Sequence, residues 1–329
     1  MLLIFIIPLL LIYIARRNFN YLSMDGRHYR VESGPVQRVA SDRLNKVVFN
    51  RVHDLSKLIG CDTRNVTYRW KLFSEELERL KFNTMSALDF GAGSLRDTYE
   101  LACRGFKVDA YDINMDQMKV CYDAYDWSKA GFKPRLIQNS LDGLHELHDQ
   151  YELIIAFDVI EHLTCLDTMV ELLKSKLTDS GTIFVSVPNC KSLIERYFKF
   201  WHMIGSKELK SSQPGVPHVN FMTPDEWASF FRKKGFDIKA HDMTIGYFVN
   251  DVWFGLYSIP SRLCIIPFIN AVASLLHVKY TAKDIEKLFY PRWLMSLVNE
   301  LDEVTKGVLK DRWGWNLFIL TRRQSYARS

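Results

Sequence analysis

The stretch Ser86-Ala-Leu-Asp-Phe-Gly-Ala-Gly-Ser94 decides how the rest of the chain is arranged. An apolar run typical of a buried strand ends at Asp89, and Gly91 and Gly93 then lead into a segment with a helical pattern, 95–104. Glycine permits a sharp turn and lets a ligand approach the main chain where a Cβ would obstruct it. The stretch therefore predicts a cofactor-binding turn between a strand and a helix.

Asp89 distinguishes between two classes of cofactor. A nicotinamide or flavin dinucleotide places its pyrophosphate at the glycine turn, where an added carboxylate repels it. The G-x-G-x-x-G fingerprint is also incomplete, because Arg96 stands where the third glycine belongs. S-adenosylmethionine has no phosphate, and its ammonium and sulfonium groups suit an acidic strand end. Asp112 closes the next apolar run about 20 residues later, where a carboxylate accepts both ribose hydroxyls. These residues favour S-adenosylmethionine.

Three motifs together resemble the class I S-adenosylmethionine-dependent methyltransferases: Asp89-Phe-Gly-Ala-Gly93, Asp112, and Ala156-Phe-Asp-Val-Ile-Glu-His-Leu163. The last is similar to the signature after strand four in the broad group that includes ubiquinone-biosynthesis O-methyltransferases. Leu95 replaces the frequent third glycine of the family's Asp-x-Gly-x-Gly-x-Gly. The resemblance covers residues 67–243 and the last ten or so, and it implies the cofactor but not the methyl acceptor.

Apolar runs and helical patterns alternate along the chain. Strands are expected at 86–90, 107–112, 134–138, 152–157, 182–187, 236–241 and 315–321, with Gly131, Gly143 and Gly181 marking connections. Helices are expected at 94–104, 115–129, 142–148 and 165–177, and from Thr223, which with Glu226 forms a capping box. The alternation predicts an α/β fold with a doubly wound, mostly parallel seven-stranded sheet of the Rossmann-like methyltransferase type. N-terminal helices precede this sheet, and a helical insertion precedes its last strand.

The resemblance implies cofactor contacts at the carboxyl ends of the strands. The amino-acid moiety would lie at Asp89 and the two glycines, the ribose at Asp112, the adenine after strand three, and the sulfonium beside Asp158. The cofactor-binding residues predicted in this way are Asp89, Gly91, Gly93, Asp112, Ile113, Ser140, Leu141 and Asp158.

Catalytic candidates follow strand four and precede the helix at Thr223. Glu161 and His162 lie in the loop after strand four, and His218 belongs to a segment that resembles the family's return over the active site. A histidine beside the methyl donor suits a general base, since its ordinary pKa lies near neutrality. The functional alternative is a metal ligand, and the structural one is a residue that orients the loop or caps the next helix. From the sequence we assign no metal to the chain.

The N-terminal segment is apolar from Leu2 to Ala15 and is followed at once by Arg16 and Arg17. It is shorter than the ~20 residues that a spanning helix usually needs. A membrane anchor is nevertheless the favoured interpretation. Lys and Arg are enriched on the cytoplasmic side of membrane segments, so the catalytic domain is expected on that side. A cleaved signal peptide and a buried helix are the alternatives.

The whole sequence divides into five predicted regions. They are a membrane segment at 1–22, a helical region at 23–83, the cofactor-binding core at 84–243, an insertion at 244–314, and the last strand with a basic tail at 315–329. The insertion is rich in aromatic residues, which is typical either of a cap over the substrate that meets the membrane interface or of an extension of the core.

Composition excludes several classes of protein. The net charge of +5 is mild and the basic residues are dispersed, so no nucleic-acid partner is expected. The six cysteines show no C-x-x-C pair, which argues against a disulfide framework or a zinc site.

The sequence therefore predicts a membrane-associated methyltransferase that acts on a lipid-like or amphipathic small-molecule acceptor, most readily at oxygen. The alternatives are a catalytically inactive, membrane-associated scaffold or binding protein with the same fold, and a dinucleotide oxidoreductase, which Asp89 and Arg96 disfavour.

Overall fold

The computed structural model describes residues 64–138, 147, 150–196, 199, 218–258 and 292–323. Contacts within the chain divide these residues into two compact units. The sheet unit draws its described residues from 64–190, 218–244 and 315–323, and the insertion unit draws its own from 191–199, 245–258 and 292–314.

The sheet unit is built on seven strands, which run in the spatial order β3-β2-β1-β4-β5-β7-β6. Strands β1 to β5 pair in parallel, and β7 pairs antiparallel with β5. The chain order reverses between β1 and β4, which is where ligands bind in open α/β sheets. The strands are β1 (Ser86–Phe90), β2 (Lys107–Asp112), β3 (Arg135–Gln138), β4 (Tyr151–Phe157), β5 (Leu177–Pro188), β6 (Phe236–Ile245) and β7 (Trp315–Arg322).

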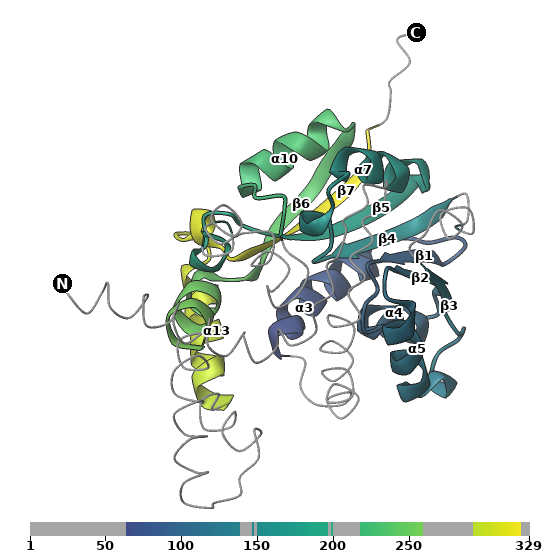
Figure 1. The fold of residues 1–329 in the computed structure, drawn as a ribbon, viewed down its shortest axis with the longest axis horizontal. Coiled ribbons are helices and arrows are strands. Elements are labelled where there is room, and N and C mark those ends of the chain that lie inside the picture. Colours follow the sequence, from purple (N-terminus) through teal and green to yellow (C-terminus); the bar gives the residue numbers. More distant parts are fainter. Residues whose placement is uncertain are drawn as a thin grey trace, which may run out of the picture. The chain divides into compact units, whose positions relative to one another are not determined.

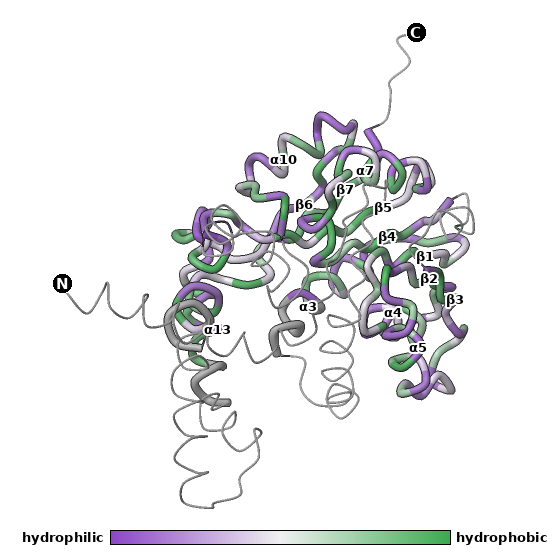
Figure 2. The backbone as a smooth tube through the Cα atoms, in the orientation of Figure 1, coloured by the Kyte–Doolittle hydropathy of each residue, from purple (hydrophilic) through white to green (hydrophobic). Residues whose placement is uncertain are grey.

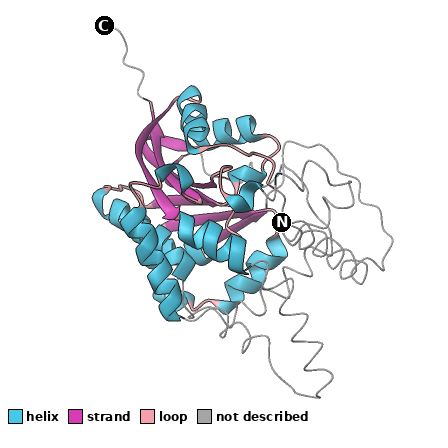
Figure 3. Cartoon of the chain, turned by 90° about the vertical axis from the view of Figure 1, so that its left-hand side faces the viewer, coloured by secondary structure: helices cyan, strands magenta, loops and turns pink. Residues whose placement is uncertain are grey.

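Helices cover both faces of this sheet (Figures 1 and 3). On one face pack α3 (Arg64–Arg79), α4 (Arg96–Cys103) and α5 (Met115–Ala124), and on the other pack α7 (Leu166–Ser175) and α10 (Pro224–Lys233). The alternation of side chains along a strand divides the core accordingly. Leu88 and Phe90 join α7 and α10, whereas Ala87 faces the opposite layer. The central strands are therefore hydrophobic on both faces. Figure 2 colours much of β4 and β5 as hydrophobic.

The predicted α/β fold is confirmed, and β1 and β2 have the predicted limits. Two local predictions were wrong. Gly181 lies inside β5 rather than in a connection, because β5 begins at Leu177 and pairs there with Tyr151 before a shift of register. The predicted helix 115–129 ends at Ala124, and a short 3₁₀ turn (Trp127–Lys129) follows it because the Asp126 carboxylate accepts the Ser128 N–H.

The capping box of α10 is confirmed. The Glu226 N–H donates to the Thr223 hydroxyl at 3.2 Å, and the Thr223 N–H donates to the Glu226 carboxylate at 2.7 Å. Trp227 and Phe231 then bury the helix against the core. Because both capping groups are local in sequence, the start of this helix was predictable.

The insertion unit contains a π-helix, η3 (Phe248–Ser258), and α13 (Arg292–Thr305). Buried Asp302 joins them, because its carboxylate accepts the N–H groups of Phe248 at 2.7 Å and Val249 at 2.9 Å. Gly246 leaves room for this carboxylate, since a Cβ there would lie 2.1 Å from Asp302 Cγ.

No helix among the described residues is both long and apolar enough to cross a membrane. The predicted membrane segment, 1–22, lies outside these residues, as do residues 23–63 of the predicted helical region at 23–83 and most of the predicted helix at 142–148.

Candidate active site

The loop after β1 requires glycine at position 91. Gly91 has φ = 88°, and the N–H groups of Gly91 and Ala92 donate to the Tyr111 carbonyl at 2.8 and 3.2 Å. A Cβ at Gly91 would lie 2.7 Å from Cγ2 of Val159, which belongs to the loop after β4. The glycine therefore allows the loops after β1 and β4 to meet at the carboxyl edge of the sheet.

Asp89 lies under this loop and is buried. Its carboxyl group accepts the Thr98 hydroxyl at 2.6 Å. Burial raises the pKa of Asp89 to about 8, and the charge of Asp97 acts in the same direction, whereas the Thr98 hydrogen bond and Arg69 oppose the rise. At neutral pH Asp89 is therefore largely protonated, and a nearby cation would favour its ionised form.

This shift predicts a pH-dependent stability. Asp89 ionises near pH 3.8 in the unfolded chain and near pH 8 in the folded chain. Its contribution to the free energy of unfolding is therefore fully present below pH 3.8 and is lost as pH rises towards 8. Asp89→Asn removes this loss. We expect the melting temperature of Asp89→Asn relative to the wild type to rise by roughly 10 °C between about pH 5 and pH 8. A difference that stays constant across this range would contradict the raised pKa.

Asp112 connects the end of β2 to the glycine loop. Its carboxylate accepts the Gly93 N–H at 2.9 Å and the Asn114 N–H at 2.8 Å. Burial raises the pKa of Asp112, and the N–H groups of Asn114, Gly93 and Ile113 act against that rise. A carboxylate has about four lone-pair sites, so these N–H groups leave it able to accept a hydroxyl as well.

The sequence-based reasoning missed Arg69 on α3. Its guanidinium donates to Asp158 at 2.8 Å and to Asp97 at 3.2 Å, and it stacks 4.5 Å above the Phe157 ring. The side chain is buried, and its Nε has no hydrogen-bond partner among the described atoms. A sequence signal exists, because Arg69 precedes Phe73 and Leu77 at intervals of four and therefore shares their apolar face.

Asp158 follows β4 in a left-handed conformation, with φ = 57°. Its carboxylate pairs with Arg69 and accepts a hydrogen bond from the Ser186 hydroxyl on β5. A non-glycine residue in this conformation persists only where its surroundings hold it, and such strain is common at functional sites. The side chain remains 45% exposed, so it is accessible at the carboxyl edge.

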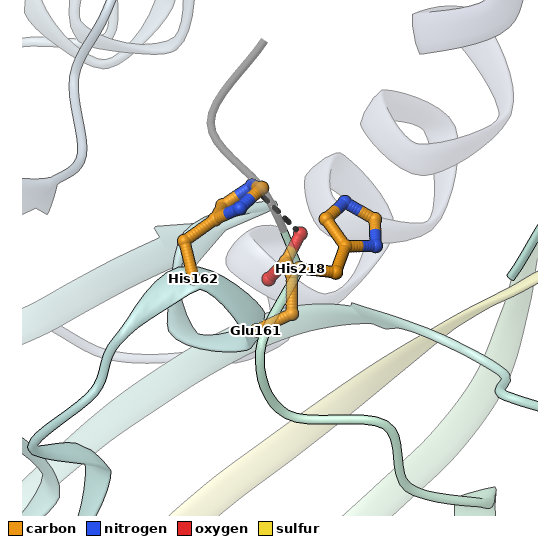
Figure 4. A group of neighbouring side chains, drawn as sticks. All are labelled: Glu161, His162 and His218. Atoms are coloured by element: carbon orange, nitrogen blue, oxygen red, sulfur yellow. Dashed lines mark ion pairs between the residues drawn. The ribbon is translucent and has the colours of Figure 1, made fainter. Parts of the chain in front are cut away.

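Glu161, His162 and His218 come together, as Figure 4 shows. Glu161 is fully buried, and one of its oxygens lies 3.6 Å from His162 Nε2. The rings of His162 and His218 have centroids 4.6 Å apart. Helix α7 begins at Leu166 after Cys165, which makes no side-chain cap, so the alternative that His162 caps this helix was wrong.

Main-chain hydrogen bonds fix the loop of His218 beside the turn of Glu161. The N–H groups of Val219 and Asn220 donate to the Glu161 carbonyl at 2.9 and 3.0 Å. The Asn220 amide donates to the carbonyls of Ile160 at 3.0 Å and Leu163 at 2.7 Å. Asn220, which the sequence-based reasoning did not single out, therefore positions His218.

The predicted cofactor residues that the structure describes lie at three neighbouring strand ends. Asp89, Gly91 and Gly93 meet Asp112 and Ile113 at the ends of β1 and β2, and Asp158 follows β4 next to them. Ser140 and Leu141 lie outside the described residues. The roles of all these residues remain predictions.

Comparisons with known proteins identify the family. The family model described as a methyltransferase domain matches residues 63–241, which is more than half of the chain. A chain of the complex between the Haloferax volcanii Trm112 methyltransferase activator and a methyltransferase is 12% identical, with 87% of this chain and 100% of that chain covered and a TM-score of 0.50.

A second solved structure is a methyltransferase from Geobacter sulfurreducens, crystallised with S-adenosylhomocysteine. It is 14% identical, with 83% of this chain and 98% of that chain covered and a TM-score of 0.44. No curated protein matches the chain in sequence. At 12% identity the structure with the TM-score of 0.50 bears on the fold alone, and the family model carries the assignment.

The residues at the ends of β1 and β2 fit S-adenosylmethionine. Gly91 and Gly93 leave the main chain open to a ligand, and Asp112 offers carboxylate oxygens beside them. Asp89 provides a carboxyl group that a cationic ligand would ionise. The chain therefore belongs to the methyltransferase-domain family, as an S-adenosylmethionine-dependent methyltransferase.

Proposed function

We propose that the enzyme methylates an oxygen atom of a lipid-like or amphipathic small molecule. The observation that carries this proposal is the pair of histidine rings, 4.6 Å apart, beside the buried Glu161. A hydroxyl acceptor must lose its proton before or during methyl transfer, and imidazole suits that task near neutral pH. An amine acceptor, by contrast, becomes reactive once it is neutral.

Each part of the site has a task in this reaction. S-adenosylmethionine supplies an electrophilic methyl group, which the acceptor must approach in line with the sulfonium. Asp112 would accept the ribose hydroxyls, and Gly91 and Gly93 would let the amino-acid moiety lie against the main chain. Arg69 keeps Asp97 and Asp158 paired, so negative charge does not accumulate around Asp89. His162 or His218 would take the acceptor proton, and positioning would supply much of the rate.

The amphipathic acceptor is supported by the sequence of the N-terminal segment. Leu2–Ala15 is apolar, and Arg16 and Arg17 follow it. An enzyme held at a bilayer by such a segment meets acceptors confined to the same surface, and its catalytic domain would face the cytoplasm.

The test is a transfer assay with methyl-labelled S-adenosylmethionine and the full chain in detergent. A total membrane lipid extract and amphipathic phenols and carboxylic acids form one set of acceptors, and short water-soluble analogues with the same reactive group form the other. We expect label in the amphipathic set, and mass spectrometry of the product to place the methyl group on oxygen. Faster methylation of the water-soluble analogues would overturn the lipid-like acceptor, and a methyl group on nitrogen or carbon would overturn the oxygen chemistry.

A further inference from the structure

We propose that Glu161, His162 and His218 bind a divalent first-row transition-metal ion that holds the acceptor oxygen. The inference rests on the proposed function in one respect, namely that the acceptor presents an oxygen. The metal site itself is argued from the side chains, and it is tested without any acceptor.

The geometry of the three side chains is close to that of a metal site. One ligand atom from each residue can be chosen so that all three lie within 4.8 Å of one another. Bonds of about 2.0 to 2.2 Å to a tetrahedral metal place ligand atoms roughly 3.4 Å apart. His162 Nε2 and Glu161 Oε1 are already 3.6 Å apart, and a shift of at most roughly 1.4 Å brings any of the three separations to that spacing. Modest side-chain rotations cover this distance.

The site is also held in place before any metal arrives. His218 reaches Glu161 because the following residues, Val219 and Asn220, donate their N–H groups to the Glu161 carbonyl. The side chain of Asn220 ties the same loop to the carbonyls on either side of Glu161 and His162. Little conformational entropy is therefore lost when the ligands close on an ion.

The burial of the Glu161 carboxylate favours a cation beside it. The side chain of Glu161 is 0% exposed and that of His162 is 21% exposed. A carboxylate taken out of water is costly unless positive charge or hydrogen bonds compensate for it. A dication bound at Glu161 would provide that charge directly.

The donor set selects the kind of metal. Two imidazole nitrogens and one carboxylate suit Zn²⁺, Mn²⁺, Fe²⁺ or Co²⁺, whereas Mg²⁺ and Ca²⁺ prefer oxygen ligands alone. Three protein ligands also leave coordination positions open, as in catalytic rather than structural sites. An acceptor oxygen and water would occupy those positions.

The metal would then change how the acceptor loses its proton. Coordination makes a hydroxyl more acidic, so its proton passes to solvent near neutral pH. The oxygen then forms a bond to the methyl carbon while the carbon–sulfur bond breaks. The electron pair of that bond remains on sulfur, so the sulfonium becomes a neutral thioether and no oxidant or reductant is needed. Bound to the metal, His162 and His218 would act as ligands rather than as proton acceptors.

The test is direct metal binding to the full chain, purified without a histidine tag and treated with a chelator. Calorimetric titration with ZnCl₂ should give one ion per chain with a micromolar or lower Kd, and MgCl₂ should give no comparable signal. Co²⁺ should produce visible absorption bands typical of nitrogen ligation. His218→Asn and Glu161→Gln should each weaken Zn²⁺ binding at least about 100-fold, because loss of even an outer-shell partner of a ligand costs about 10- to 100-fold.

His241→Gln is the matched control. His241 is also a half-buried histidine of the sheet unit, but it bonds to Asn316 at 2.9 Å and stacks on Phe318. Its Zn²⁺ affinity should equal that of the wild type. Melting temperatures measured without metal show whether each variant folds, and a folded His218→Asn chain that binds Zn²⁺ as tightly as the wild type overturns the site.

The metal site and the proposed function fail in different ways. If the chain binds no Zn²⁺ or Co²⁺, or if chelated enzyme methylates an oxygen acceptor as fast as metal-loaded enzyme, the metal inference is wrong and the proposed function stands. If Zn²⁺ binds through His218 but every product carries its methyl group on nitrogen or carbon, the proposed function is wrong and the metal site stands.

Discussion

Asp112→Asn should lower the affinity for S-adenosylhomocysteine at least about 100-fold. The Asp112 carboxylate accepts the N–H groups of Gly93 and Asn114 and, in the proposed complex, two ribose hydroxyls. An asparagine has the same shape, but its amide nitrogen donates and therefore opposes one backbone N–H or one hydroxyl. Each hydrogen bond to a charged group contributes about 1.5 to 3 kcal/mol, so the loss of one or two gives this factor. Calorimetric titration measures it.

Asp116→Asn is the control for this variant. Asp116 is exposed in the first turn of α5. The substitution Asp116→Asn removes one negative charge, as Asp112→Asn does, but four residues away. Its affinity for S-adenosylhomocysteine should stay within about threefold of the wild type, because surface charges contribute little at this distance. If Asp112→Asn and Asp116→Asn bind S-adenosylhomocysteine equally well, Asp112 does not hold the ribose. If the wild type does not bind it either, the scaffold alternative is favoured again.

Gly91→Ala should destabilise the enzyme and abolish cofactor binding. The new Cβ would lie 2.7 and 2.8 Å from Cγ2 and Cβ of Val159, and the backbone keeps φ = 88°. Overpacking costs about 1 to 3 kcal/mol, and a left-handed conformation adds about 1 kcal/mol for alanine. We expect the melting temperature to fall by roughly 10 °C, measured by differential scanning fluorimetry.

Gly105→Ala separates the two contributions. Gly105 has nearly the same conformation, φ = 91°, but a Cβ there would meet nothing within 4 Å. Its melting temperature should fall by only about 3 °C, because only the backbone term remains. Val159→Ala combined with Gly91→Ala should recover part of the loss by removing both Cγ methyl groups. A Gly105→Ala loss as large as that of Gly91→Ala would contradict the packing argument.

Local patterns predicted the elements that depend on neighbouring residues. The limits of β1 and β2 follow from short apolar runs, and the start of α10 follows from the Thr223–Glu226 capping box. The limits of β5 did not follow, because its first residues are in a strand only through their pairing with Tyr151. Strand pairing joins residues that are distant in sequence, and the local hydrophobic periodicity does not predict it.

The sequence alone determined the strand and glycine turn at Asp89–Gly93, the fold class and the family, because the Asp-x-Gly-x-Gly turn and the acid that closes β2 act over short stretches of chain. Only the tertiary structure decided which charged groups meet. Arg69 reaches Asp158 across 89 residues, and the loops of Glu161 and His218 meet across a long excursion of the chain. The raised pKa of Asp89 likewise comes from burial beneath α4. These properties depend on packing and desolvation, which arise only when distant segments come together.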